Sequence, residues 1–197
     1  YPQDISLLNE AREKLEAIIY RFCRSYDLLL PRRYRRRARK DYLAYAKSRK
    51  HSAEKIRKAL RKQLGYVGRD IRYLDEFMSR GYAMTDKEIG LYLTILMLYG
   101  QQKYMYDNKV HSVEHRIVSI TQPWIRPVVR GKARAAVEFG AKFDLSLDRE
   151  GCGHIEKISF EAYNESTCLI EAVERFKART GHYPERVLAD QIYRTRA

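Results

Sequence analysis

The sequence predicts a mixed α/β (α+β) protein in which a basic helical half precedes a smaller half that contains strands. Residues 1–110 carry 25 Lys and Arg against 13 Asp and Glu, whereas residues 111–197 carry 14 against 12. Apolar residues recur at helical spacing in the first half and alternate with polar ones in the second. With 197 residues, 45% of them hydrophobic, the chain can form a real core. We therefore expect a basic helical subdomain over 1–110 and an α/β subdomain over 111–197.

The first half contains at least three helical patterns. The first helix has apolar residues at helical spacing, namely Ile5, Leu8, Leu15, Ile18, Ile19 and Phe22. Pro31 is expected to end it, because proline disfavours helical geometry in the residue before it. A second long helix is expected to begin near Tyr34, and a last one covers about 86–108 behind a capping box of Thr85 and Glu88.

The second helix carries a heptad seam, formed by Leu60, Leu64, Val67, Ile71, Leu74 and Met78. Gly65 and Gly68 lie inside it and each weakens a helix by about 1 kcal/mol, which leaves a break there open. Because the seam is short, we favour an internal helical hairpin that packs on the first helix over a dimerising coiled coil.

The second half predicts a strand, a hairpin, a second strand, a helix and a last strand. Apolar residues alternate with polar ones over 137–147, the pattern of a half-buried strand, and Gly151 and Gly153 mark the turn that follows. Residues 155–160 form the second strand, and residues 166–178 a helix that Gly181 stops. Residues 187–189 form the last strand and deliver Asp190 to its carboxyl end.

The charge favours an anionic partner, nucleic acid first and a membrane surface second. Residues 32–62 carry 15 basic and 2 acidic residues within a total net charge of +14. The densest part, the basic tract, comprises Arg32, Arg33, Arg35, Arg36, Arg37, Arg39 and Lys40. Guanidinium groups on a helix bind phosphates without sequence preference. A solvated helix face is the plainer interpretation, and we favour nucleic acid at this density. Tyr34, Tyr42 and Tyr45 could pack on sugar or base.

Several other classes are disfavoured. Three widely spaced cysteines form no disulfide framework and fit a reducing compartment, and no CxxC or CxxH pattern supports zinc. No signal peptide is visible, and the longest apolar stretch, 89–99, is too short to span a bilayer. We therefore expect no membrane partner.

Asp190 is the strongest candidate for catalysis, although an aspartate after a strand is usually a cap or turn residue. Strand-end carboxylates hold the metal ions of two-metal phosphodiester chemistry, but that role needs at least two of them. Four other carboxylates of this half are expected to face solvent: Glu138, Asp144, Asp148 and Glu150. The partners of Asp190 are therefore expected outside these 197 residues.

Four segments together resemble the DDE transposases of bacterial insertion sequences, specifically the insertion sequence five family. They are residues 1–12 (YPQDISLLNEAR), 119–132 (SITQPWIRPVVRGK), 138–142 (EFGAK) and 189–196 (ADQIYRTR). The resemblance implies an RNase H-like core, incomplete here, with a large all-helical insertion that 1–110 matches. It implies a site of two aspartates and a glutamate that binds Mg²⁺ or Mn²⁺ only in the complete enzyme. Asp190 matches the second aspartate; the first is expected upstream of Tyr1 and the glutamate after Ala197, and Asp4 is neither.

The resemblance also implies a function. The complete enzyme would cut and join DNA strands at transposon ends: metal-activated water attacks the phosphodiester, and the freed 3′-hydroxyl attacks target DNA. Arg130, Lys132 and Lys142 would contact phosphates near the site, and the basic tract would hold DNA. The chain by itself is expected to be inactive, the full-length protein could form a homodimer, and its place would be the bacterial cytoplasm, at the nucleoid. Two alternatives stay open: a non-catalytic helical nucleic-acid-binding module, and the remnant of a decayed transposon.

Overall fold

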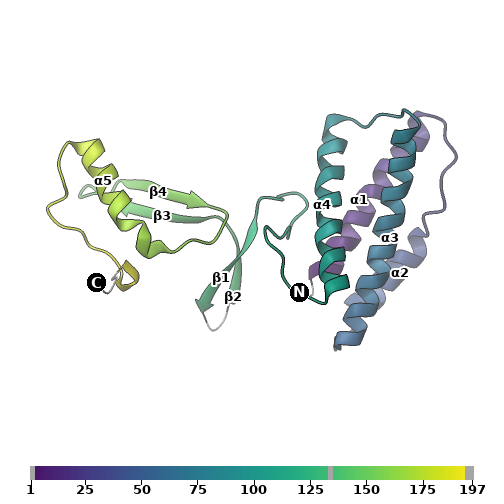
Figure 1. Ribbon diagram of the computed structural model, residues 1–197, viewed down its shortest axis with the longest axis horizontal. Coiled ribbons are helices and arrows are strands. Elements are labelled where there is room, and N and C mark those ends of the chain that lie inside the picture. Colours follow the sequence, from purple (N-terminus) through teal and green to yellow (C-terminus); the bar gives the residue numbers. More distant parts are fainter. Residues whose placement is uncertain (1–2, 133–134, 194–197) are drawn as a thin grey trace. The chain divides into compact units, whose positions relative to one another are not determined.

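The computed structural model describes residues 3–132 and 135–193, with the side chains of 4–128 and 137–193. The chain divides into two compact units, Tyr1–Pro123 and Trp124–Ala197, which are described separately (Figure 1). The first is helical and the second contains two small antiparallel sheets and a helix. The predicted mixture of helices and strands is thereby confirmed.

The first unit is a helical bundle. Its helices are α1 (Gln3–Ser25), α2 (Arg35–Ala46), α3 (Ala53–Ser79) and α4 (Asp86–Asn108). α1 and α3 lie in the middle, and α2 and α4 flank them on opposite sides (Figure 1). The capping box predicted at Thr85 and Glu88 is present at the start of α4. α1 ends at Ser25, before the predicted stop at Pro31.

The predicted apolar stripes form the core of this unit. All six predicted positions of α1 are buried, and four of the seam positions of α3 join them: Leu64, Val67, Ile71 and Leu74. Phe22 of α1 stacks on Phe77 of α3 with ring centroids 5.7 Å apart. The seam therefore packs inside the bundle on α1, as the helical-hairpin interpretation required.

The long helix expected from Tyr34 is instead two helices. The chain leaves helical geometry after Ala46 and re-enters it at Ala53, where the side chain of Ser52 accepts a hydrogen bond from the N–H of Lys55. α3 then runs unbroken through Gly65 and Gly68. Burial of the seam on α1 outweighs the weak helix propensity of two glycines, because tertiary packing supplies most helix stability in proteins.

The two glycines are expected to respond differently to alanine. At Gly65 an added Cβ would meet no atom within 4 Å, whereas at Gly68 it would lie 2.5 Å from the hydroxyl oxygen of Tyr99 on α4. Gly65→Ala should therefore raise the free energy of unfolding by about 1 kcal/mol. Gly68→Ala should raise the free energy of unfolding by less, because the Tyr99 ring must move. Urea unfolding of both variants measures the difference, and equal gains would contradict the close approach of α3 and α4.

Residues 109–123 belong to the helical unit, although composition placed a boundary at 110. Ile117 and Ile120 are buried in its core, and the guanidinium of Arg116 donates to the carboxylate of Asp4. The amide of Gln102 on α4 donates to the same carboxylate at 2.9 Å. Asp4 therefore ties the start of α1 to α4 and to the segment that follows it.

The second unit contains two separate antiparallel hairpins. Their strands are β1 (Arg126–Lys132) with β2 (Ala135–Gly140), and β3 (Lys142–Leu147) with β4 (Gly153–Ser159). The predicted hairpin is present as β3 and β4. The single strand expected over 137–147 is divided at Gly140, whose φ of 150° lies in the region open mainly to glycine. Its first half, β2, pairs with β1.

The covered face of the second hairpin is the opposite of the predicted one. Asp144, expected to face solvent, is buried at 8% exposure, whereas Phe143 and Leu145 beside it are exposed. Helix α5 (Leu169–Thr180) lies along this hairpin (Figure 1) and presents Arg179, whose guanidinium donates to the buried carboxylate of Glu156 at 2.7 Å. An ion pair thus lies between α5 and the sheet.

The last predicted strand is absent. Residues 187–189 have no strand pairing among the described residues, and Leu188 is 89% exposed. A strand is stable only when its backbone groups bond to a neighbour, and the apolar run of 187–189 does not supply one. The two short turns η1 (Glu165–Thr167) and η2 (Gln191–Tyr193) complete the unit.

Candidate nucleic-acid interface

Five residues of the basic tract lie in the first turns of α2, and Arg32 and Arg33 precede the helix. Polar contacts hold α2 on the bundle. Asp41 accepts from the ammonium of Lys62 at 2.6 Å and from the hydroxyl of Tyr66 at 2.7 Å, both on α3. Burial opposes ionisation, but these two bonds lower the pKa of Asp41 below its ordinary value. Arg69 of α3 donates to the backbone oxygen of Arg33. These contacts therefore hold α2 against α3.

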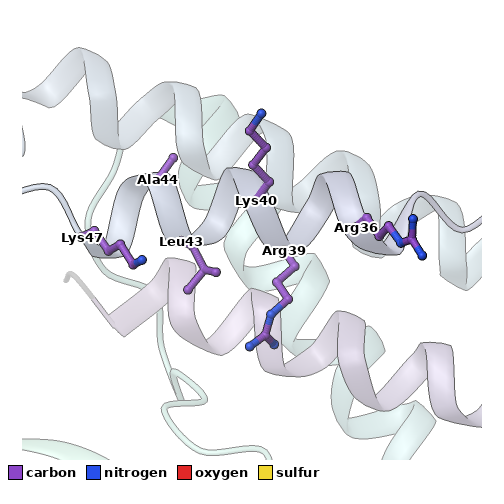
Figure 2. A pocket seen from close by; sticks show the side chains of 6 residues that line it. All are labelled: Arg36, Arg39, Lys40, Leu43, Ala44 and Lys47. Atoms are coloured by element: carbon purple, nitrogen blue, oxygen red, sulfur yellow. The ribbon is translucent and has the colours of Figure 1, made fainter.

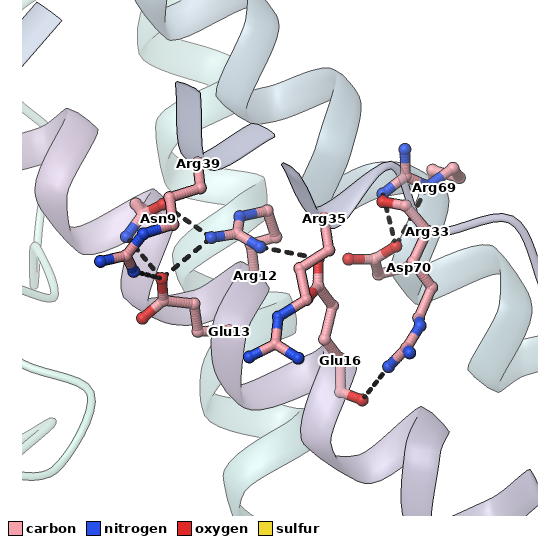
Figure 3. Close-up of polar contacts among 9 residues, drawn as sticks. All are labelled: Asn9, Arg12, Glu13, Glu16, Arg33, Arg35, Arg39, Arg69 and Asp70. Atoms are coloured by element: carbon pink, nitrogen blue, oxygen red, sulfur yellow. Dashed lines mark hydrogen bonds and ion pairs between the residues drawn. The ribbon is translucent and has the colours of Figure 1, made fainter. Parts of the chain in front are cut away.

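One side of the tract faces α1 (Figure 3). Arg35 pairs with Glu16 and Arg39 with Glu13, each at 3.9 Å, and Arg33 donates to the backbone oxygen of Glu16 at 3.3 Å. Arg35 and Arg39 nevertheless stay largely exposed. Exposed pairs at this distance contribute little to stability, so both arginines can turn towards an anionic ligand.

The other side carries cations with no carboxylate partner. Among the described residues, none forms an ion pair with Arg36, Lys40 or Lys47. These residues follow one another along α2 and, with Arg39, line an open pocket of about 460 Å³ whose apolar wall is Leu43 and Ala44 (Figure 2). An unpaired cation gains more binding free energy from a phosphate than a paired one does, because no internal ion pair is lost. We call the three unpaired cations Arg36, Lys40 and Lys47 the α2 basic face; Arg39 lies at its edge, towards α1.

The positive surface continues beyond α2. The exposed cations of the following loop and the first turns of α3 are Arg49, Lys50, Lys55, Arg57, Lys58 and Arg61. The helical unit, 1–123, carries 26 basic and 14 acidic residues, and 124–197 carry 13 and 11. The positive field therefore belongs almost entirely to the helical unit.

The tyrosines near the tract take structural roles. Tyr42 and Tyr45 are half-buried: the hydroxyl of Tyr42 is 3.3 Å from that of Ser6, and the ring of Tyr45 lies 4.3 Å from His51. Tyr34 lies between the guanidinium groups of Arg32 and Arg69, at 4.7 and 5.3 Å from its ring centre. The expectation that they pack on sugar or base therefore gains no support at Tyr42 and Tyr45.

Beneath the tract lies a buried polar cluster that periodicity does not reveal (Figure 3). Arg12 of α1 is buried, and its guanidinium donates to Glu16 at 2.7 Å and to Asn9 at 2.9 Å. Asp70 of α3 is also buried and accepts from Arg69 at 2.9 Å through Oδ1, while its Oδ2 has no hydrogen-bond partner among the described residues. Only the i,i+4 spacing of Arg12 and Glu16 hinted at this cluster.

Asp70 is expected to make stability depend on pH. Burial raises its pKa to about 6, although Arg69 opposes the shift. Because the unfolded value is about 4, this contribution to stability is complete below about pH 4 and is lost as the pH rises through 6. The free energy of unfolding of the wild type, minus that of Asp70→Asn, should fall by about 2–3 kcal/mol between pH 4 and 7.

Urea unfolding at several pH values measures this difference. Asp41→Asn is the control of opposite sign, because the folded pKa of Asp41 is lowered and its contribution is lost on acidification. A wild-type and Asp70→Asn difference that does not vary with pH would contradict an ionisation of Asp70 near pH 6.

In the second unit, no hydrogen bond or ion pair joins the two predicted site residues whose side chains the structure describes, Asp190 and Lys142. Asp190 is exposed in coil, and its carboxylate accepts from the N–H of Gln191 at the start of η2. Lys142, predicted to contact phosphate, instead pairs with Glu165 at 2.8 Å and donates to the backbone oxygen of Tyr163 at 2.7 Å. Arg130 and Lys132 lie in β1, but their side chains are outside the described residues.

Among the described residues, Asp190 belongs to no group of three or more ligand residues close enough to hold one ion. Among the described residues, the group of ligand atoms close enough to hold an ion consists of Asp148, Glu150 and Cys152 in the β3–β4 turn. Asp148 there accepts from the backbone N–H groups of Glu150 and Cys152, so turn formation accounts for the cluster. The residues described here thus do not by themselves fit a metal pair.

Comparison of the chain with family models, curated proteins and solved structures gave no match. The described helices also include none with both the length and the apolar character needed to cross a bilayer.

Proposed function

We propose that this protein binds nucleic acid, and DNA in the first place, through the α2 basic face. The observation that carries the proposal is the row of unpaired cations Arg36, Lys40 and Lys47 on a helix fixed to the bundle. Because α2 is already held on the bundle, phosphate binding restricts the side chains but not the helix, and it releases counterions. Backbone contacts of this kind set orientation and affinity but carry no sequence information.

We further propose that the chain is an interior part of a DDE transposase of the insertion sequence five family. This step rests on the four resembling segments, with support from the helical unit of 1–123, which is basic as the proposed DNA-holding insertion should be. The order β3, β4, α5 and then Asp190 suits an incomplete RNase H-like core. In the complete enzyme Asp190 would be one of three acidic ligands of Mg²⁺ or Mn²⁺, and the bacterial cytoplasm would be its place.

A specific observation favours the rival function, a non-catalytic nucleic-acid-binding module. Asp190 lies in an exposed turn, residues 187–189 are coil, and no described group of three or more ligand residues includes Asp190. A decayed transposon remnant would have the same features. The rivals agree on binding and differ on chemistry, which makes Asp190 the discriminating residue.

The binding proposal is tested by titrating a fluorescently labelled duplex with the protein at several salt concentrations. If Arg36, Lys40 and Lys47 each displace one counterion, log K should fall with log salt with a slope of about −2.7 or steeper. Binding that is absent at low salt, or that does not change with salt, would overturn the proposal. Single-turnover strand cleavage by this chain with Mg²⁺ would overturn its expected inactivity.

A further inference from the structure

The outer face of α4 carries an apolar stripe that the bundle does not cover. Ile89, Leu93, Met97 and Tyr104 are 42%, 52%, 61% and 56% exposed, and they extend over about 22 Å of the helix. The opposite face of α4 is buried in the core through Tyr92, Ile95, Leu98 and Met105. A helix that is apolar all round is normally buried on all sides, so we expect another protein surface to cover the outer stripe.

The stripe also allows a close approach. Gly90 and Gly100 are exposed on α4, and a Cβ added at either would meet no atom within 4 Å. They recur with the apolar residues at steps of four and three: Gly90, Leu93, Met97, Gly100 and Tyr104. This is a heptad seam that combines small and large side chains, which suits packing against another helix.

We propose that the α4 stripe is the contact between two copies of this chain, with the two α4 helices antiparallel. Residues 89–102 hold no charge, so an anionic ligand has nothing to bind there. Charge lies only at the ends: Asp86, Lys87 and Glu88 at the start, and Lys103, Asp107 and Lys109 at the finish. The start is net negative and the finish net positive, so an antiparallel pair brings opposite ends together, and the helix dipoles are then also opposed.

With a twofold axis near Met97, small residues of one copy lie opposite large residues of the other. Gly90 of one copy then lies towards Tyr104 of the other, and Leu93 towards Gly100, as an isologous contact requires. Covering the stripe on both copies would bury roughly 1,000 Å², the lower limit for a specific interface. The dimer is therefore a weak one, and α2, on the opposite side of the bundle, remains available to DNA in both copies.

Sedimentation equilibrium over a range of protein concentrations tests the contact. The apparent mass should rise from 23.4 kDa towards twice that value. Met97→Glu should abolish the rise, whereas Leu29→Glu, at a 96% exposed apolar residue elsewhere in the helical unit, should leave it unchanged. Circular dichroism confirms that both variants are folded. A monomer at every concentration, or a dimer that tolerates Met97→Glu, would overturn the proposal.

Cysteine crosslinking in a Cys152→Ser background tests the direction of the helices. Met97→Cys should crosslink to itself, because it lies near the axis. Ile89→Cys should crosslink poorly to itself and well to Tyr104→Cys. Equal self-crosslinking at all three positions would indicate parallel helices and overturn the proposed arrangement.

Discussion

Replacing Arg36, Lys40 and Lys47 together with alanine is expected to weaken duplex DNA binding roughly 10- to 100-fold at about 0.1 M salt. Each of these cations lacks a carboxylate partner among the described residues, so each is available to a phosphate. Losing three such contacts should also make the slope of log K against log salt shallower by about 2.7. Fluorescence anisotropy with a labelled duplex, repeated over a salt series, measures both effects.

The matched control removes the same charge from paired cations. Lys14, Arg80 and Lys103 each pair with a carboxylate four residues away on the same chain segment, namely Glu10, Glu76 and Asp107. Their triple replacement by alanine should change the affinity and the slope much less. Similar losses in the two triple variants would mean that binding follows net charge, and that α2 has no particular role.

Replacing Asp190 with asparagine in a complete protein that contains this chain is expected to reduce strand cleavage by at least about 10³-fold. The amide lacks the negative charge with which a carboxylate holds a divalent cation. DNA affinity should stay nearly unchanged, because Asp190 lies outside the unit that carries the positive field. Single-turnover cleavage of a labelled transposon end, measured beside equilibrium binding, separates the two quantities.

Glu185→Gln is the control for this substitution, because it removes the same charge from an exposed residue five positions earlier. It should leave cleavage at the wild-type rate. If Asp190→Asn cleaves as fast as the wild type, or if the complete protein never cleaves DNA, the nucleic-acid-binding module becomes the better description. The binding proposal on α2 would stand in either case.

The β3–β4 hairpin of the second unit buries a polar side chain and exposes apolar ones. Phe143, Leu145 and Ile158 of the β3–β4 hairpin are more than half exposed, whereas Asp144 is buried and its Oδ2 has no hydrogen-bond partner among the described residues. Burial and the neighbouring Asp144 raise the pKa of the Cys168 thiol. If the chain is an interior part of a transposase, as proposed, the rest of an RNase H-like core would cover this apolar face.

The sequence by itself determined the features that depend on near neighbours in the chain. The buried face of α1, the capping box of Thr85 and Glu88, the packed seam of α3 and the turn between β3 and β4 all follow from spacing and local hydrogen bonding. Each of these signals acts within a few residues, so periodicity suffices to read it. The position of the basic tract on a helix was predictable for the same reason.

Only the tertiary structure decided which groups meet across the chain. The separation of Arg35 and Arg39, which face α1, from the unpaired Arg36 and Lys40 depends on how α2 packs. The burial of Asp144 and the ion pair of Lys142 with Glu165 depend on the elements that cover β3, so alternation alone assigned the face of Asp144 wrongly. Residues 187–189 have a strand-like sequence but no described neighbour to bond to. Strand formation and burial require a partner from elsewhere in the fold, and a local pattern does not identify that partner.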